Sequence, residues 1–134
     1  MVRGISHITL IVRDLEKSSA MLATVLDAEE IYSSGDRTFS HSRERFFLVG
    51  SVWIALMEGP ALTARTYNHI AFHIDDAEFA TYRERVTKLG LDIDNDRSRI
   101  AGEGRSLYFY DYDNHLFELH TGTLEERLRA YTDQ

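Results

Sequence analysis

Cysteine is absent from the chain, and proline occurs once among its 134 residues. The lack of cysteine excludes disulfides, thiolate nucleophiles and cysteine-ligated metals, and it fits a reducing compartment. One proline and eight glycines leave no room for a low-complexity linker. No apolar run is long enough to span a bilayer, and the segment MVRGISHITLIVRD lacks the apolar core of a signal peptide. We therefore expect a cytoplasmic protein that has no membrane partner.

Positive charge is also scarce. Fifteen lysines and arginines stand against 22 acidic residues, which gives a net charge of -7. This balance argues against nucleic acid or an anionic membrane as the partner, and an anionic substrate would need a local cluster of arginines. The hydrophobic fraction of 43% is too high for a disordered chain, and the length suits one domain or two small modules that share a core.

One short pattern occurs twice. The stretch SHITLIVRD covers Ser6 to Asp14, and NHIAFHIDD covers Asn68 to Asp76. Each has a histidine in second place, then apolar residues in alternation, then an acidic turn. Alignment of His7 with His69 brings the following segments into register, so the chain contains an internal repeat.

Each copy continues in the same order of predicted elements. Helices are predicted for Leu15–Leu26 and Ala77–Leu89, with Asp14 and either Asp75 or Asp76 as N-caps. The predicted strands after them are Glu29–Ser33, Arg37–His41 and Phe46–Leu56 in the first copy, and Leu91–Asn95, Arg105–Tyr110 and His115–His120 in the second. A last helix, Thr123–Tyr131, is capped by Thr123.

The fold class expected from these elements is α+β, with two β-α-β-β-β modules. We expect a single domain over residues 1–134, with module 1 at about 4–59, module 2 at about 66–122 and the C-terminal helix at about 123–131. Neither half would bury a full core alone, so the halves must pair within one chain or between chains.

Strand periodicity singles out three polar residues. His7 shares a strand face with Thr9, and the opposite face of that strand is apolar. His69 and Glu118 stand in the same way on their strands, and a buried carboxylate needs a partner or a cation. A lone strand histidine is usually structural, but two at equivalent positions of a repeat favour a shared site. His73 lies ~13 Å from His69 along an extended strand and cannot easily share a metal with it.

Two histidines and one carboxylate suit Zn, Mn or Fe(II). The remaining histidines, His41, His115 and His120, are assigned to loops, turns or the surroundings of the site. When the closing strands of the two copies are aligned, Ala55 stands where the second copy has Glu118. A symmetric site of four ligands thus becomes one of three, and open positions are what a catalytic metal needs.

These residues resemble the vicinal oxygen chelate superfamily (glyoxalases, bleomycin-resistance proteins and dioxygenases), and within it the fosfomycin-resistance proteins. The resemblance is carried by GISHITLIVRDL, FFLVGSVWIALMEG, RTYNHIAFHI and GEGRSLYFYDYDNHLFELHTGTLEERL, which cover nearly the whole chain. It implies Mn(II), with other divalent metals possible, bound by His7, His69 and Glu118. It further implies attack on the oxirane of fosfomycin, a small phosphonate epoxide. A homodimer with shared sites is implied too, with His7 from one chain and His69 and Glu118 from the other.

The branches of this family differ in the nucleophile, and the FosX type adds water. Glu44, in SHSRERFFL, resembles the general base of that type, although a glutamate between two arginines in a predicted loop is ordinarily a solvated charge. Water needs a base, whereas a thiol can ionise on its own. The stretch GEGRS has Arg105 where the glutathione branch has an acidic residue of its potassium loop, so no potassium requirement is expected.

The phosphonate needs donors. The resemblance places Thr9, Tyr108 and Arg127 near it and adds Tyr67, Arg99 and Ser106. From the residues alone these are an ordinary strand threonine, sheet tyrosines and an exposed helical arginine. Trp53 is assigned to the core or to the wall of the pocket.

Three alternative functions remain open on the sequence. A thiol transferase of the same fold would act on fosfomycin only with a thiol present and would not need Glu44. An iron extradiol-type dioxygenase also uses two histidines and a glutamate, but it consumes oxygen. A drug-binding module without metal would not need the three ligands.

Overall fold

The structure is a computed structural model that describes residues 1–94 and 100–133. The chain forms two compact units. Unit 1 comprises Met1–Ala64 together with Tyr112–Asn114, and unit 2 comprises Arg65–Asp111 and His115–Gln134. Each unit has a four-stranded sheet of its own.

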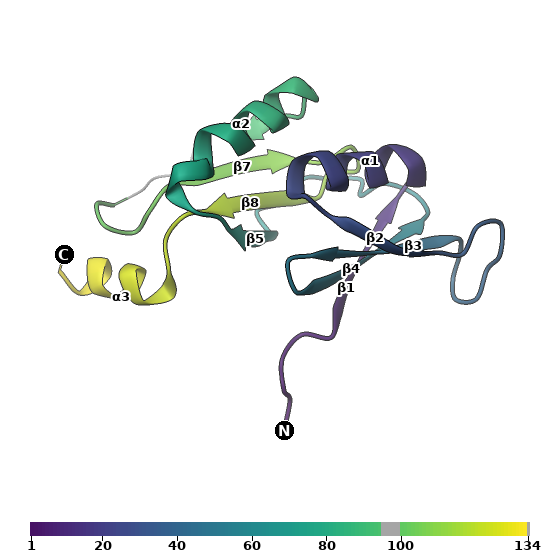
Figure 1. Cartoon of the computed structure of the whole chain (residues 1–134), viewed down its shortest axis with the longest axis horizontal. Coiled ribbons are helices and arrows are strands. Elements are labelled where there is room, and N and C mark those ends of the chain that lie inside the picture. The colour runs from purple at the N-terminus through teal and green to yellow at the C-terminus, as the bar shows by residue number, and fades with distance from the viewer. Residues whose placement is uncertain (95–99, 134) are drawn as a thin grey trace. The chain divides into compact units, whose positions relative to one another are not determined.

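Unit 1 contains β1 (His7–Val12), α1 (Leu15–Leu26), β2 (Glu29–Ser33), β3 (Glu44–Val49) and β4 (Val52–Glu58). The strand order is β1-β4-β3-β2; β1 is parallel to β4, and the other neighbours are antiparallel. Helix α1 begins at Asp14, whose side chain accepts a hydrogen bond from the backbone N–H of Lys17, as the sequence predicts. It covers one face of the sheet (Figure 1).

The core of unit 1 lies between α1 and this sheet face. It is made of alternate strand residues and one stripe of the helix: Leu10, Val12, Phe47, Ile54 and Leu56 from the strands, and Met21, Leu22 and Val25 from α1. The alternation expected from the sequence is therefore present. It turns His7 and Thr9 toward the face that α1 does not cover.

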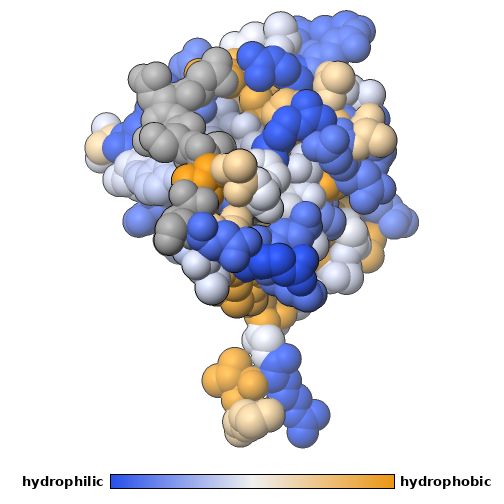
Figure 2. Space-filling model, turned by 90° about the vertical axis from the view of Figure 1, so that its left-hand side faces the viewer, coloured by the Kyte–Doolittle hydropathy of each residue, from blue (hydrophilic) through white to orange (hydrophobic). Residues whose placement is uncertain are grey.

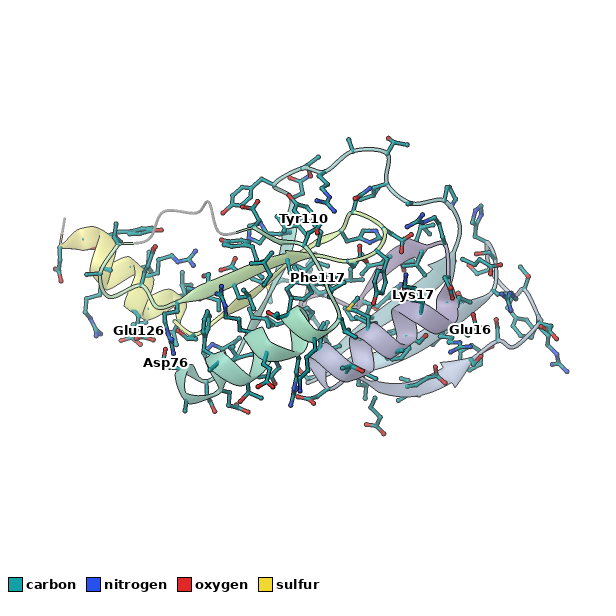
Figure 3. The ribbon with its side chains drawn as sticks, turned by 90° about the horizontal axis from the view of Figure 1, so that it is seen from above. Glu16, Lys17, Asp76, Tyr110, Phe117 and Glu126 are labelled. Atoms are coloured by element: carbon teal, nitrogen blue, oxygen red, sulfur yellow. The ribbon has the colours of Figure 1, made fainter. Side chains whose placement is uncertain are left out.

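Unit 2 contains β5 (His69–His73), the short 3-10 helix η1 (Asp76–Glu78), α2 (Phe79–Lys88), β6 (Ile93–Asp94), β7 (Ser106–Tyr110), β8 (Leu116–His120) and α3 (Leu124–Thr132). The strand order β5-β8-β7-β6 repeats that of unit 1. Phe117 stacks on Phe109 and Phe72 with ring centroids 5.6 and 6.3 Å away, and it lies in the interior beside α2 (Figure 3). Thr123 and Glu126 form a capping box at the start of α3.

The predicted fold class is confirmed, since both copies run β-α-β-β-β. Two predicted strands are wrong. Residues 37–41 form no strand, with bends from residue 39 on, and the run Phe46–Leu56 is divided into β3 and β4 by a turn at Gly50, whose φ is 59°. Glycine adopts this left-handed backbone readily, and the turn joins β3 to β4 in a hairpin. The nearly continuous apolar sequence on both sides of Gly50 is the reason that one strand was predicted. Among the described residues no helix is long and apolar enough to cross a membrane.

Several large apolar side chains are not covered by the chain itself. Leu124, Leu128 and Tyr131 are exposed and share one face of α3 by their spacing. Met1 and Ile5 are exposed in the N-terminal segment, which extends away from β1 (Figures 1 and 2). The surface around α3 shows hydrophobic residues between hydrophilic ones in Figure 2. Exposed groups of this kind are typical of surfaces that a partner covers.

Arg105, the residue before β7, forms an ion pair with Asp76 at the start of η1. Its Nε lies 2.8 Å from Asp76 Oδ1, and its guanidinium carbon is 4.4 Å from the ring centre of Phe79 (Asp76 is labelled in Figure 3). The hydrogen bond from Arg105 lowers the pKa of the Asp76 carboxyl below its ordinary value of 3.8. A depressed pKa adds stability above the unfolded value, and this is lost as the pH falls through the folded pKa.

Replacement of Arg105 by alanine should therefore raise the pKa of Asp76 toward its ordinary value. The measurement is an NMR titration of the carboxyl carbons. Lys88→Ala is the matched control, because Lys88 pairs with Glu84 in the same unit. An unchanged Asp76 titration in the Arg105 variant would contradict the assigned cause.

Candidate active site

The strands of unit 2 bring His69 and Glu118 together. In the parallel pairing of β5 with β8, His69 stands opposite Leu116 and Ala71 stands opposite Glu118. The side chains of His69 and Glu118 project from the same face of the sheet, and Glu118 is displaced along it by two residues from His69. His69 Nε2 lies 3.0 Å from Glu118 Oε1. Glu118 is only 3% exposed, so its charge is largely removed from water.

The hydrogen bonding of His69 decides what this contact can be. Its Nδ1 lies 2.7 Å from the backbone carbonyl oxygen of Tyr67, which can only accept, so Nδ1 carries the proton. In the neutral ring Nε2 then presents a lone pair to the carboxylate of Glu118. Two ligand atoms each about 2.1 Å from an ion and at right angles to each other are about 3.0 Å apart. The pair therefore fits two ligands of one divalent metal.

Side chains from β7 and α3 surround Glu118. Ser106 Oγ lies 2.6 Å from Glu118 Oε2 and 2.6 Å from His120 Nδ1. Arg127 on α3 approaches His120 Nε2 at 3.3 Å. Tyr108 stands opposite Glu118 in the sheet and shares a 3.0 Å hydrogen bond between hydroxyls with Tyr67. The sequence predicts each of these as a site residue except His120, whose period-two spacing from Glu118 was the available signal.

Unit 1 offers the equivalent sheet face. His7 stands opposite Trp53, with ring centroids 4.2 Å apart and planes at 30°, and its Nδ1 lies 3.0 Å from Ser6 Oγ. Thr9 stands opposite Ala55, as Ala71 stands opposite Glu118 in unit 2. The predicted equivalence of Ala55 with Glu118 is thus confirmed by the strand register. Trp53 lies against a predicted metal ligand.

Glu44 corrects a sequence expectation. It begins β3 instead of lying in a loop, and it is buried, with 8% exposure. Its backbone is held by Ser34, whose Oγ accepts from Glu44 N–H at 3.0 Å. Glu44 and Ile11 both stand opposite Met57, so Glu44 shares the sheet face of His7 but lies two strands across and four residues along from it. That spacing corresponds to roughly 10 Å across and 13 Å along the sheet.

The two arginines beside Glu44 have other carboxylates as partners. Arg43 Nη2 lies 2.6 Å from Glu58 Oε2, and this hydrogen bond raises the pKa of Arg43 and lowers the pKa of Glu58. Arg45 reaches Glu16 and Glu30 at 3.2 and 3.4 Å (Glu16 is labelled in Figure 3). Arg43 and Arg45, which led us to expect a solvated charge at Glu44, therefore pair with carboxylates other than that of Glu44.

The predicted site residues are divided between the units. Unit 2 holds six of them, on or beside one face of its sheet: Tyr67, His69, Ser106, Tyr108, Glu118 and Arg127. Unit 1 holds His7, Thr9 and Glu44. Arg99 lies outside the described residues. In the part of the chain that the structure describes, no three histidines or carboxylates of this chain form a metal cluster.

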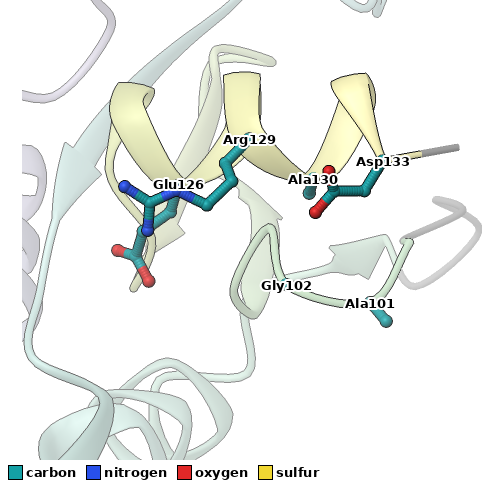
Figure 4. Close-up of a pocket in the computed structure, with 6 residues that line it drawn as sticks. All are labelled: Ala101, Gly102, Glu126, Arg129, Ala130 and Asp133. Atoms are coloured by element: carbon teal, nitrogen blue, oxygen red, sulfur yellow. The ribbon is translucent and has the colours of Figure 1, made fainter.

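Two cavities lined by described residues lie away from these residues. A cavity of about 410 Å³ in unit 2 opens between α3 and the loop before β7, lined by Ala101, Gly102, Glu126, Arg129, Ala130 and Asp133 (Figure 4). A smaller one of about 200 Å³ in unit 1 lies beside Lys17, whose Nζ is 4.1 Å from the ring centre of Tyr112. Neither contains a predicted ligand or base, so we place the chemistry at the sheet faces.

The chain matches known proteins over nearly its full length. The sequence model of the Glyoxalase/Bleomycin resistance protein/Dioxygenase superfamily matches residues 4–119. The fosfomycin resistance protein FosX of Listeria innocua is 63% identical over 98% of both chains. The metallothiol transferase FosB of Staphylococcus saprophyticus is 33% identical, covering all of this chain and 87% of its own.

A solved FosX structure is also similar to this chain. It is a mutant of FosX from Listeria monocytogenes complexed with Mn(II) and 1S,2S-dihydroxypropylphosphonic acid. It is 56% identical, covers 98% of this chain and 99% of that one, and superposes with a TM-score of 0.90. The chain therefore belongs to the glyoxalase/bleomycin resistance/dioxygenase superfamily and, within it, to the FosX family.

Gly122, two residues after His120, is predicted to be required for packing. A Cβ at Gly122 would lie 2.3 Å from the carbonyl oxygen of Glu103 and 2.9 Å from His120 Nε2. Gly122→Ala should therefore cost about 1–3 kcal/mol of unfolding free energy, measured by urea denaturation. Gly59→Ala should also be destabilising, because its Cβ would lie 2.5 Å from the β-branch methyl Cγ2 of Ile11. A Gly122→Ala protein as stable as the wild type would contradict the packing argument.

Proposed function

We propose that this protein is a Mn(II)-dependent hydrolase that adds water to the oxirane of fosfomycin and thereby confers resistance. The observation that carries the proposal is the His69–Glu118 pair, whose ligand atoms converge at 3.0 Å. FosX relatives at about sixty per cent identity support it, as does the ligand of the FosX structure from Listeria monocytogenes. That ligand is a vicinal diol, which is what water leaves when it opens a propyl epoxide.

His7, His69 and Glu118 would hold the Mn(II). Imidazole nitrogen and carboxylate oxygen suit this ion, and three protein ligands leave positions for substrate. When bound, the ion supplies Lewis-acid stabilisation of the alkoxide that forms as the ring opens. His69 is oriented for this role by the carbonyl of Tyr67, and Glu118 by Ser106.

The phosphonate would be held by donors from both units. We assign Thr9, Tyr108 and Arg127 to it, together with Tyr67 and the undescribed Arg99. Arg127 would supply local positive charge in a chain that is acidic overall, and a bound anion turns the attack into an effectively unimolecular step. Ser106 fits this role less well, because its hydroxyl hydrogen is directed at Glu118.

Glu44 would act as the general base and take a proton from the attacking water. Its burial and its place on the sheet face of His7 favour this role over that of a surface charge. A thiol transferase would not need it, and the FosB relative is much more distant than the FosX relatives. The dioxygenase and the drug-binding module are disfavoured by the same ranking. A cytoplasmic location and the lack of a potassium requirement stay predictions.

The site would be shared between two copies of the chain, with His7 from one and His69 and Glu118 from its partner. The ligands are divided between the two units of the chain, and exposed apolar groups on α3 and the N-terminal segment offer surface for a second copy. A two-fold dimer of this kind contains two equivalent sites.

Mixing subunits tests the shared site. His7→Ala and Glu118→Ala should each be inactive alone and bind Mn(II) weakly. In a heterodimer one site collects both changes and the other collects neither, so a 1:1 mixture should recover up to about one quarter of wild-type fosfomycin hydration. Phosphorus NMR measures the diol. Verified heterodimers without activity would rule out ligation from two chains.

Replacement of Glu44 separates a hydrolase from a transferase. In Glu44→Gly fosfomycin should still bind, because the metal and phosphonate ligands remain, while hydration falls by roughly 10²–10⁴-fold. Some thiol adduct should form with added glutathione, since the carboxylate that would repel a thiolate is gone. Mass spectrometry at equal Mn(II) loading distinguishes diol from adduct.

The matched control for this variant is Glu30→Gly, which also removes a carboxylate from the same sheet but from its exposed edge strand β2. It should hydrate fosfomycin as the wild type does. Full hydration by Glu44→Gly would assign the base to another residue. A wild type that forms only thiol adducts would move the protein to the transferase branch.

A further inference from the structure

A directed chain of hydrogen bonds ends on Glu118. It runs from Arg127 Nη2 to His120 Nε2 at 3.3 Å, from His120 Nδ1 to Ser106 Oγ at 2.6 Å, and from Ser106 Oγ to Glu118 Oε2 at 2.6 Å. His120 Nδ1 also lies 3.3 Å from Glu118 Oε2 itself. His120 itself is 9% exposed. The far oxygen of Glu118, Oε1, is the one that faces His69.

Counting hydrogens fixes the direction of this chain. Ser106 has one hydroxyl hydrogen, and an ionised carboxylate can only accept, so the 2.6 Å contact requires Ser106 to donate to Glu118. His120 Nδ1 must then carry a proton and donate to Ser106 Oγ. Arg127 can only donate, so His120 Nε2 accepts. The imidazole is thereby held as the neutral Nδ1-protonated tautomer.

We propose that His120 is a positioning residue for the metal site: it holds the Ser106 hydroxyl on Glu118 Oε2 and so presents Oε1 to the ion. Without the donor at Nδ1, nothing on that side holds the Ser106 hydroxyl in the orientation that points at Glu118. Glu118 Oε2 would then be less firmly held by Ser106 and would lose its direct contact with the imidazole. This role rests on the proposed function only in requiring that the chain binds Mn(II).

The packing around His120 leaves the ring little freedom. Gly122 lies so close to the ring that a Cβ at this residue would be 2.9 Å from His120 Nε2. Gly104 packs against Gly122 in turn, since a Cβ at Gly104 would be 2.6 Å from the backbone nitrogen of Gly122. His73 stands directly opposite His120 in the neighbouring strand but is exposed. The two histidines thus share a position along the sheet, and they differ in burial and in the bonds to Ser106 and Arg127.

The test measures Mn(II) affinity of the full-length protein by electron paramagnetic resonance titration, which reports free Mn(II) without any substrate. His120→Leu and Ser106→Ala should each weaken binding by about 10–100-fold, the usual effect of losing a group that orients a ligand. The double variant should lose less affinity than the product of the two single losses, since His120 and Ser106 act on the same oxygen of Glu118. His120→Asn, whose amide can donate from near the Nδ1 position, should stay within about threefold of wild type.

His73→Leu is the matched control and should leave the affinity unchanged. Long-range proton–nitrogen NMR of the full-length protein before metal addition should show His120 protonated at Nδ1, a readout that survives even if His120→Leu does not fold. Wild-type affinity in His120→Leu, additive losses in the double variant, or a proton on Nε2 would each overturn the role. A wild type that does not bind Mn(II) would instead overturn the metal site itself.

Discussion

The contact between His69 Nε2 and Glu118 Oε1 is the constraint on which the rest of the structure depends. With the ring neutral, Nε2 presents a lone pair to a carboxylate oxygen 3.0 Å away, and the carboxylate is almost wholly removed from water. Such an arrangement is costly unless a cation lies between the two groups. The parallel pairing of β5 with β8 brings the side chains together, and the carbonyl of Tyr67 turns the ring so that Nε2 points inward.

The repeat explains why the site is asymmetric. In both units the first strand carries a histidine and runs parallel to the last, and the register is the same. Unit 1, however, has Ala55 where unit 2 has Glu118, and Trp53 packs against its histidine. In the proposed site, a unit of the second kind would contribute His69 and Glu118, and a unit of the first kind would contribute His7 alone. Three protein ligands would leave positions open for substrate, whereas two units that each carried a histidine and a glutamate would supply four.

Periodic segments were predictable from the sequence because local pattern decides them. Helix Leu15–Leu26 and strand Glu29–Ser33 end where predicted. The failures depend on distant partners. Residues 37–41 alternate like a strand but form none in the described structure, where β2 pairs with β3 instead. The burial of Glu44 could not be predicted, because its neighbours Arg43 and Arg45 find carboxylates that only the folded sheet brings near. Spacing alone singled out His7, His69 and Glu118 as candidate ligands, whereas the part proposed for His120 depends on bonds that only the folded structure shows.

The separation of Glu44 from His7 follows from the chemistry proposed for them. A nucleophile that opens an epoxide approaches the carbon from the side opposite the departing oxygen. If that oxygen is held by the ion, the base that activates water must stand on the far side of the substrate. A base next to His7 would compete for the ion and could not reach the attacking water. Glu44 stands on the same face as His7 but two strands away, so in the proposed site it would not compete with His7 for the ion.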